Sequence, residues 1–424
     1  MFYKETNFQD SPIGKISKDW EVGDLDSFCE KVKAGGTPLT TNKNYWNGDI
    51  PFVKIEDLTA SGKYLVKTQS FISKDGLANS SAWIVPENSL ILAMYGSMGE
   101  ISINKIPAAT NQAILGIIPK SKEDVDFLYY WYLFFKRNWK RYAKLTTQAN
   151  LTAEIVRGSV IPIPPQQERR AVVGVLGVVD SAIGLVDRVI WKTERLKKGL
   201  MQKLLTEGIG HKEFKDTEIG KIPKQWVVTK IGEHLELLTG FPFKSNLFSK
   251  DKSGIRLVRG INVTSGRLRW DRPQYWNKST EGLEKYLLAE KDVLIGMDGA
   301  LVGRNYAIVK KEELPLLLVQ RVARLRTKAG IHSEFLYYSI GSNSFRRYVD
   351  SVNTSSGIAH ISGKQIEDFQ IPLPSFEEQL RIVEVLSTVS TKLQLEIKEK
   401  SKLERIKQGL MDLLLSGKVR VKVD

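Results

Sequence analysis

The side chains that most often perform catalysis are few and dispersed in this sequence. The chain has four histidines and one cysteine, and these five residues, His211, His234, His332, His360 and Cys29, show no zinc-ligand spacing. Each Gly-Lys pair is followed by a residue other than Ser or Thr, so a Walker-type phosphate loop is absent. The sequence therefore predicts neither a metal centre nor a nucleotide-hydrolysing site.

Motifs of DNA-modifying enzymes are also missing. An adenine methyltransferase needs an Asn/Asp-Pro-Pro-Tyr/Phe motif, but Pro164-Pro165 lies between Ile163 and Gln166. The glycines at 96–99 and 299–303 are interpreted as tight turns rather than as a cofactor loop. Carboxylates are plentiful, yet no pair is singled out by its spacing, so a nuclease site is unsupported. A binding protein is the better interpretation.

Residues that suit nucleic-acid contacts occur in the loops. Residues 31–38, Lys-Val-Lys-Ala-Gly-Gly-Thr-Pro, offer two lysines, a hydroxyl and glycine amides that we expect to be accessible to phosphate. Lys54 aligns with Arg259 across an internal repeat, and Gln112 aligns with Gln320. Arg and Lys can read guanine, and Asn and Gln can read adenine, in the major groove.

Any one of these residues alone could be part of a solvated loop or a helix cap, but the set recurs in both halves of the chain. The expected DNA-binding residues are Lys31, Lys33, Gly35, Gly36, Thr37, Lys54, Tyr95, Ser97, Asn111, Gln112, Thr146, Thr147, Gln148, Lys244, Ser245, Arg259, Asn262, Gln320, Arg321, Asn353, Thr354 and Ser355.

The composition agrees with a polyanionic partner. Lys and Arg number 63 against 48 Asp and Glu, a formal charge of +15, although such an excess can also serve solubility alone. The single cysteine fits a reducing compartment. The polar N-terminal segment and the shortness of the apolar runs predict a soluble, cytoplasmic protein without membrane contact.

The elements that position these loops are duplicated. Residues 8–20, FQDSPIGKISKDW, return at 214–226 as FKDTEIGKIPKQW, with eight identities in thirteen positions. The two copies of the repeat match strongly in such boundary segments and weakly in the middle of each half. Short β-branched runs at 50–55, 82–85, 90–94 and 114–118 are typical of strands, and 126–142 is predicted to be a helix. Each half is thus an α/β (α+β) unit.

A long helix follows each unit, at 166–206 and at 376–416. Apolar residues recur along each in steps of three and four, with a gap at Thr193 and with Leu196 and Ile406 counted in the stripes. Forty-one residues make a rod of roughly 60 Å. Two core helices of an ordinary domain are the alternative, but such helices are usually shorter. We expect an antiparallel coiled coil with pseudo two-fold symmetry, which could space two DNA-reading units by one or two helical turns.

The repeated segments at the start of each unit and at the two ends of each long helix resemble a known family. Ile-Gly-Lys-Ile-x-Lys-x-Trp at the start of each unit, Lys-Ala-Gly-Gly-Thr-Pro at 33–38, Thr-Asn-Gln-Ala at 110–113, Ile-Pro-Ile/Leu-Pro before each long helix and Gly-Leu-Met-x-x-Leu-Leu near its end all resemble the specificity subunits of type I restriction-modification systems. The likeness spans essentially the whole chain. The first long helix departs from the pattern at Gln166-Gln-Glu-Arg169, and the second unit has Gly-Phe-Pro at 240–242 in place of Gly-Gly-Thr-Pro.

The resemblance implies a non-catalytic subunit with two target-recognition domains that read a bipartite, asymmetric double-stranded DNA sequence. Its domains would be residues 1–165, a first recognition domain; 166–208, a spacer helix; 209–375, a second recognition domain; and 376–424, a second spacer helix and tail. Two methyltransferase and two restriction subunits would bind S-adenosylmethionine, ATP and magnesium themselves. The expected partner-binding residues are Glu168, Arg169, Leu200, Met201, Glu378, Gln379, Leu410 and Met411. The alternatives are a self-contained methyltransferase or nuclease, and a basic scaffold indifferent to sequence.

Overall fold

The structure, a computed structural model, describes residues 2–143, 151–353 and 359–422. The chain forms two compact units: unit 1 comprises Met1–Asp187 with Lys398–Asp424, and unit 2 comprises Arg188–Ile397. The division falls inside two long helices, α7 (Gln166–Thr206) and α11 (Phe376–Leu414), so each helix contributes to both units. Among the described residues, no helix is both long and apolar enough to cross a membrane.

Among its described residues, unit 1 holds two sheets of more than two strands and three strand pairs. The larger has the order β5 (Cys29–Ala34), β13 (Ile114–Pro119), β10 (Ser89–Ala93), β11 (Ile101–Asn104) and β7 (Tyr64–Leu65). The smaller has the order β8 (Ser70–Ile72), β6 (Trp46–Val53), β12 (Ala108–Thr110) and β9 (Ile84–Val85). Paired strands are β1 (Phe2–Lys4) with β28 (Val419–Val421), β2 (Phe8–Ser11) with β3 (Gly14–Ser17), and β4 (Glu21–Asp24) with β14 (Val160–Ile163). A strand lies at each of the four predicted runs, although β6 ends at Val53, before the predicted end at Ile55, and β9 covers only Ile84–Val85 of the run 82–85.

The central helix of unit 1 is α4 (Asp124–Phe135), whose side chains are almost all buried. A helix that is apolar around its whole circumference belongs inside a core. It lies between the larger sheet and the long helices, where its aromatic residues share one core with Val172 and Leu176 of α7 and Leu414 of α11. The remaining helices are α1 (Leu25–Phe28), η1 (Lys43–Tyr45), α2 (Ile55–Ser61), α3 (Lys74–Ala78), η2 (Lys136–Asn138), α5 (Trp139–Ala143) and α6 (Ala153–Arg157).

Unit 2 repeats this plan. Its main sheet has the order β18 (Leu235–Thr239), β26 (Val322–Thr327), β23 (Val293–Gly296) and β24 (Tyr306–Ile308), and a second has the order β22 (Tyr275–Trp276), β19 (Ile255–Val258) and β25 (Leu316–Leu318). Paired strands are β15 (Phe214–Thr217) with β16 (Gly220–Pro223), β17 (Val227–Lys230) with β27 (Gln370–Leu373), and β20 (Val263–Thr264) with β21 (Arg267–Leu268). Besides short 3-10 helices and the long helices, the α-helices are α8 (Ser333–Ile340), α9 (Asn343–Val352) and α10 (Gly363–Glu367). Helix α8 takes the place of α4.

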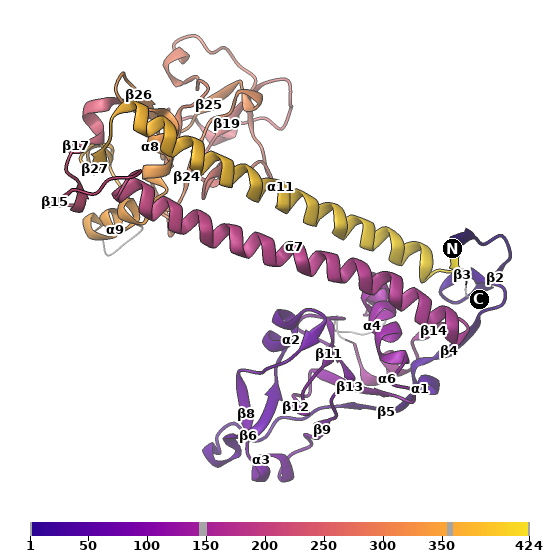
Figure 1. The fold of residues 1–424 in the computed structure, drawn as a ribbon. Coiled ribbons are helices and arrows are strands. Elements are labelled where there is room, and N and C mark those ends of the chain that lie inside the picture. Colours follow the sequence, from indigo (N-terminus) through magenta and orange to yellow (C-terminus); the bar gives the residue numbers. More distant parts are fainter. Residues whose placement is uncertain (1, 144–150, 354–358, 423–424) are drawn as a thin grey trace. The chain divides into compact units, whose positions relative to one another are not determined.

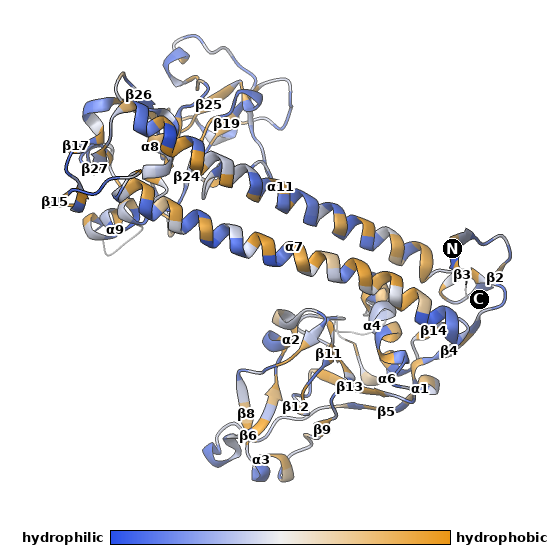
Figure 2. Cartoon of the chain, viewed as in Figure 1, coloured by the Kyte–Doolittle hydropathy of each residue, from blue (hydrophilic) through white to orange (hydrophobic). Residues whose placement is uncertain are grey.

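The long helices pack antiparallel within each unit, as predicted (Figure 1). In unit 1, Asp180 pairs with Lys407 at 2.6 Å and Asp187 pairs with Lys400 at 2.7 Å. Residue numbers therefore increase along α7 in the direction in which they decrease along α11. In unit 2, Leu204 and Leu205 of α7 share a core with residues 382–386 of α11. Figure 2 shows hydrophobic and hydrophilic residues alternating along both helices.

One detail of the predicted stripes is wrong. Leu196 and Ile406 are 54% and 43% exposed, whereas Thr193 is buried and Lys197 and Lys407 are half-buried. The helical period continues through the supposed gap at Thr193 and brings polar side chains to the buried face. A prediction from hydrophobicity alone therefore placed Leu196 and Ile406 on the buried face and missed Thr193, Lys197 and Lys407, which lie there.

In each unit, a side-chain hydrogen bond joins the segment after the first strands to the start of a long helix. In unit 1, the Trp20 indole donates to Glu168 at 3.1 Å, and Arg420 of β28 also binds this carboxylate, at 2.7 Å. In unit 2, the Trp226 indole donates to Glu378 at 2.9 Å, and His211 lies 2.8 Å from the same carboxylate. The two units therefore use the same tryptophan–carboxylate contact, each with a cationic or titratable partner.

These contacts correct the expected partner surface. Glu168 and Glu378 are buried by the contacts above, Arg169 binds Asp124 at 2.8 Å, and Gln379 is fully buried with His332 N donating to its side chain. The four apolar residues of the prediction, Leu200, Met201, Leu410 and Met411, belong to or pack against the two main cores. Glu168, Glu378, Gln379 and Met411 are therefore buried and stabilise the units, whereas Arg169, Leu200, Met201 and Leu410 are only partly buried.

Candidate nucleic-acid interface

The carboxyl ends of four strands meet at one edge of unit 1. Gly35 N donates to Ile114 O at 3.0 Å, and Gly36 N donates to Thr110 O at 2.9 Å, which fastens the end of β5 to β12 and β13. Asn111 N donates to Val53 O, so the end of β6 lies beside the end of β12. Met94 N, just past β10, donates to Ala113 O at 2.8 Å. The loops after these strands therefore form one cluster, which we call strand-end cluster 1.

Several expected DNA-binding residues come together there. The Thr37 hydroxyl donates to the side-chain oxygen of Gln112, and both residues are exposed. Lys54 precedes α2, and its ammonium lies 5.6 Å from the centre of the Trp46 ring. Tyr95 is half-buried in the loop after β10, and burial raises the pKa of its hydroxyl. The cluster thus presents a hydroxyl, an amide, an ammonium and a phenol.

Three further residues belong to the loops of cluster 1. Ser97 is half-buried in the turn after Tyr95. The side chain of Asn111 accepts a hydrogen bond from Ala113 N at 3.1 Å, which shapes the loop. Gly96 has φ +79°, in agreement with the predicted tight turn. The loop geometry is therefore fixed by local hydrogen bonds, while Gln112 points outward.

The expectation for Gly35 and Gly36 is wrong. Both glycines are buried and their amides already donate to the backbone. A Cβ at Gly35 would lie 2.1 Å from Thr110 O, and one at Gly36 would lie 2.1 Å from the Ser81 hydroxyl. The glycines permit close packing of strand ends and do not offer amides to phosphate.

Lys31 and Lys33 lie within β5 and not at its end. Both are exposed, and the Lys31 ammonium lies 4.3 Å from the centre of the Trp83 ring. The Trp83 indole in turn donates to Ala34 O at 3.1 Å. These lysines supply positive charge beside the cluster, which suits contact with a phosphate backbone more than with a base edge.

Unit 2 reproduces the same main-chain frame. Gly240 N donates to Val322 O as Gly35 does to Ile114, and Met297 N donates to Arg321 O as Met94 does to Ala113. Val319 N donates to Val258 O, in the manner of Asn111 and Val53. These bonds define strand-end cluster 2, and they confirm the alignment of Gln112 with Gln320 and of Lys54 with Arg259.

The side chains on the frame differ. Asp298 takes the place of Tyr95, and its carboxylate lies 3.2 Å from Nε of Arg321 and binds the ring of His360. Arg321 has φ +70° and is exposed, as is Gln320. A non-glycine residue in the left-handed region costs about 1 kcal/mol, and such residues are enriched at functional sites. Cluster 2 therefore presents an arginine held by an acid, whereas cluster 1 presents a phenol and a hydroxyl.

Two other residues of unit 2 have structural roles. Asn262 is buried, accepts from Arg259 N at 3.1 Å and donates to Arg269 O at 3.0 Å, so it cannot reach a base and its predicted role is wrong. It corresponds to Asp57, which accepts from Lys54 N at 2.9 Å. The guanidinium of Arg259 donates to Arg272 O at 2.8 Å, which fixes its direction.

The remaining expected residues lie further along the loops. Lys244 and Ser245 are exposed at the turn after β18, and Asn353 follows the end of α9. Thr146, Thr147, Gln148, Thr354 and Ser355 lie outside the described residues. Asp298 and His360 were missed by the sequence analysis, which named Tyr95 as an expected DNA-binding residue but did not carry that role across the repeat to Asp298.

Comparison with known proteins agrees with this geometry. Residues 17–191 and 223–405 match the family model of the type I restriction modification DNA specificity domain. The chain therefore belongs to this family, whose members are non-catalytic specificity subunits.

Individual relatives span the whole chain. The MjaVIII specificity subunit of a type I restriction enzyme from Methanocaldococcus jannaschii is 29% identical over all of this chain and 98% of its own length. A putative MjaX specificity subunit from the same organism is 26% identical over all of this chain and 99% of its own. The crystal structure of the S subunit from M. genitalium superposes with a TM-score of 0.56 at 16% identity, covering 96% of this chain and 97% of the other. That likeness shows a shared fold.

Proposed function

We propose that this chain reads a bipartite, asymmetric DNA target, with strand-end cluster 1 contacting one half and strand-end cluster 2 contacting the other. The observation that carries the proposal is the combination of one main-chain frame with two sets of side chains. Equivalent frames would approach the groove in the same way, and different side chains would select different bases. Tyr95 against Asp298 and Ala113 against Arg321 are the clearest differences.

The charge of the chain supplies the sequence-independent part of the affinity in this proposal. Lysines beside the clusters, such as Lys31 and Lys33, would contact phosphates and release counterions, so binding should weaken as salt rises. The exposed side chains at the clusters would then provide the base contacts. Arg321, Gln320 and Gln112 are the residues best placed by exposure for this role.

We further propose that the chain assembles with two methyltransferase and two restriction subunits, which would bind S-adenosylmethionine, ATP and magnesium. Among the described residues, no three His, Cys, Asp or Glu side chains are grouped to hold a metal. Exposed apolar residues on the long helices support a protein partner, because side chains such as Val178, Leu185, Trp191 and Leu395 are more than half exposed. We propose that the partner subunits bind these exposed apolar residues and not the buried residues that the sequence analysis named.

The test is selection of bound duplexes from a random pool at physiological salt, with the purified chain alone and with its methyltransferase subunit. We expect enrichment of two short, unlike motifs at a fixed separation. Equal affinity for all duplexes would contradict the proposal and leave a non-specific basic scaffold. Methylation or cleavage of DNA by the chain alone would instead indicate a self-contained enzyme.

A further inference from the structure

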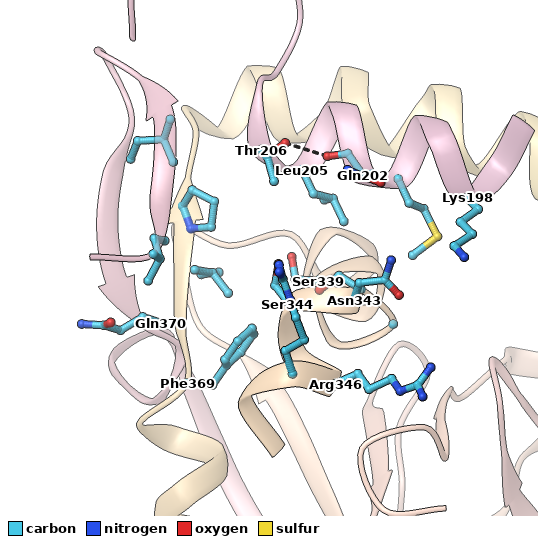
Figure 3. Close-up of a pocket in the computed structure, with 18 of the residues that line it drawn as sticks. Lys198, Gln202, Leu205, Thr206, Ser339, Asn343, Ser344, Arg346, Phe369 and Gln370 are labelled. Atoms are coloured by element: carbon cyan, nitrogen blue, oxygen red, sulfur yellow. Dashed lines mark hydrogen bonds between the residues drawn. The ribbon is translucent and has the colours of Figure 1, made fainter. Parts of the chain in front are cut away.

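A cavity of about 620 Å³ opens in unit 2 between the last turns of α7, helix α9 and strands β16 and β27. Figure 3 shows Leu205, Phe369 and Arg346 around this space. Its lining combines an apolar part, which includes Met201, with basic residues. Arg346 and Arg347 lie exposed on the first turns of α9.

Unit 1 has a cavity of about 570 Å³ at the corresponding place. Its apolar lining comes from Met98, Leu133 and Met411. Arg137 and Lys140, on the short helices that follow α4, are exposed on its rim. These helices follow α4 in the chain as α9 follows α8, so both cavities lie between the end of a long helix and the basic segment behind an aromatic helix.

The two cavities use repeated residues. Glu194, Lys197 and Met201 of α7 line one, and Glu404, Lys407 and Met411 of α11 line the other. Six of the eleven residues at 196–206 recur unchanged at 406–416. The strand-end clusters, in contrast, carry different side chains. A surface that is kept the same in both units suits a ligand that arrives in two identical copies, whereas a surface that differs suits two unlike ligands.

The lining indicates what kind of ligand fits. The unit 2 cavity is lined by five cationic and two acidic side chains, and the unit 1 cavity by four and one. Both are therefore positive, which favours an acidic ligand. Methionine and leucine side chains in the lining would leave a hydrated phosphate without hydrogen-bond partners, but they can pack against an apolar side chain. An acidic peptide segment with one apolar anchor satisfies both features.

We propose that the two cavities are equivalent docking sites for an acidic segment with an apolar anchor residue, present once in each of two identical partner subunits. This inference rests on the proposed function only in taking the methyltransferase subunit as that partner. The exposed apolar residues of the long helices would form a separate part of the same contact.

The test uses the full chain co-purified with its methyltransferase subunit, and native mass spectrometry counts the copies bound. We expect two copies on the wild type, one on Arg346→Glu/Arg347→Glu, one on Arg137→Glu/Lys140→Glu and none on the quadruple variant. The control is Lys74→Glu/Lys328→Glu, which reverses two exposed lysines away from both cavities and should keep two copies. Two copies on the quadruple variant would overturn the proposal.

Duplex DNA is the competing ligand, and the same variants distinguish it. Loss of affinity of the chain alone for a random duplex, with two partner copies retained, would assign the cavities to the phosphate backbone and refute the docking proposal. If duplex selection enriches no target, the proposed function fails. The number of partner copies that native mass spectrometry counts does not depend on that result. Circular dichroism and the melting temperature check folding. If the melting temperature of a glutamate variant falls, the milder Arg346→Gln/Arg347→Gln replaces it in unit 2 and Arg137→Gln/Lys140→Gln replaces it in unit 1, and each should reduce occupancy in its own unit.

Discussion

Glu168 and Arg420 form a buried ion pair that joins the start of α7 to the strand β28, 252 residues further along the chain. The same guanidinium donates to Glu5 at 2.8 Å and to Asp19 at 2.8 Å, and it lies 5.6 Å from the centre of the Trp20 ring. Three carboxylates and one arginine therefore hold together the N-terminal strands, α7 and the C-terminal strand of unit 1.

Arg420→Met should destabilise unit 1 strongly. The substitution keeps an aliphatic side chain but leaves the buried carboxylates of Glu5 and Glu168 without their cation, which typically costs about 3–5 kcal/mol. Urea unfolding of the full chain measures the change. Arg405→Met, at an exposed position on α11, is the control and should stay within about 0.5 kcal/mol of the wild type. A loss below about 1 kcal/mol for Arg420→Met would contradict the role of the pair.

Unit 1 should also lose stability in acid. The Asn7 amide holds the pKa of Glu5 at about 2, and hydrogen bonding from Arg420 lowers the pKa of Asp19 to about 2. Because the folded chain binds fewer protons than the unfolded chain between these values and the ordinary 4.5 and 3.8, stability rises with pH in this window. The contribution is complete above about pH 4.5 and is lost as pH falls toward 2.

Urea midpoints measured between pH 5.5 and 2.5 follow this loss. The wild-type midpoint should fall more steeply than that of Arg420→Met, in which Asp19 and Glu5 have lost the guanidinium. Parallel curves for the two proteins would show that Arg420 is not coupled to these carboxylates.

Substitutions at the two strand-end clusters should affect different halves of the target. Arg321→Ala removes an exposed guanidinium in unit 2, and Gln112→Ala removes an exposed amide in unit 1. Each should cost about 1–3 kcal/mol at one base position and relax selectivity there. Duplex selection with each variant measures this. Relaxed selectivity in both halves from a single substitution would contradict the assignment of one cluster to each half.

Exchange of residues 209–375 for those of another family member should change one half of the recognised sequence and leave the other unchanged. The second strand-end cluster lies entirely within this segment, and cluster 1 lies outside it. Duplex selection with the hybrid chain is the measurement. An unchanged target in both halves would contradict the proposal.

Insertion of seven residues into each long helix should lengthen the gap between the half-sites and leave both motifs alone. Seven helical residues add about 10.5 Å, the length of about three base pairs. The insertions after Ile190 and after Leu393 would keep the heptad phase of the buried stripes. Selection of duplexes with variable spacers measures the preferred gap, and an unchanged gap would mean that the helices do not set it.

The repeated units and long helices were predictable because their signals are local. The periodicity of α7 and the duplicated joint at 8–20 and 214–226 are visible without any knowledge of contacts. The role of Glu168 was not predictable, because its burial depends on Trp20 and on Arg420, which lie 148 and 252 residues away in the chain. The sequence repeats both tryptophans but does not show what they contact.

The candidate interface was predictable in part, for a similar reason. Gln112 and Gln320 were found because both units keep a glutamine at the same place. Asn262 was misassigned because an exposed amide and an amide that caps a backbone turn are the same residue type in a sequence. Asp298 was missed although its counterpart Tyr95 was an expected DNA-binding residue, because a tyrosine in one unit does not indicate a carboxylate at the same place in the other.

The pairing of β1 with β28 also sets an order of events during protein synthesis. Unit 2 is continuous in sequence, whereas unit 1 requires residues 398–424 in addition to its N-terminal part. A ribosome therefore makes all of unit 2 before it makes Arg420, and the carboxylates of Glu5, Asp19 and Glu168 have no guanidinium partner while unit 2 is synthesised. A chain cut after Leu414 would keep all of unit 2 but would leave unit 1 without strand β28 and without the ion pairs of Arg420.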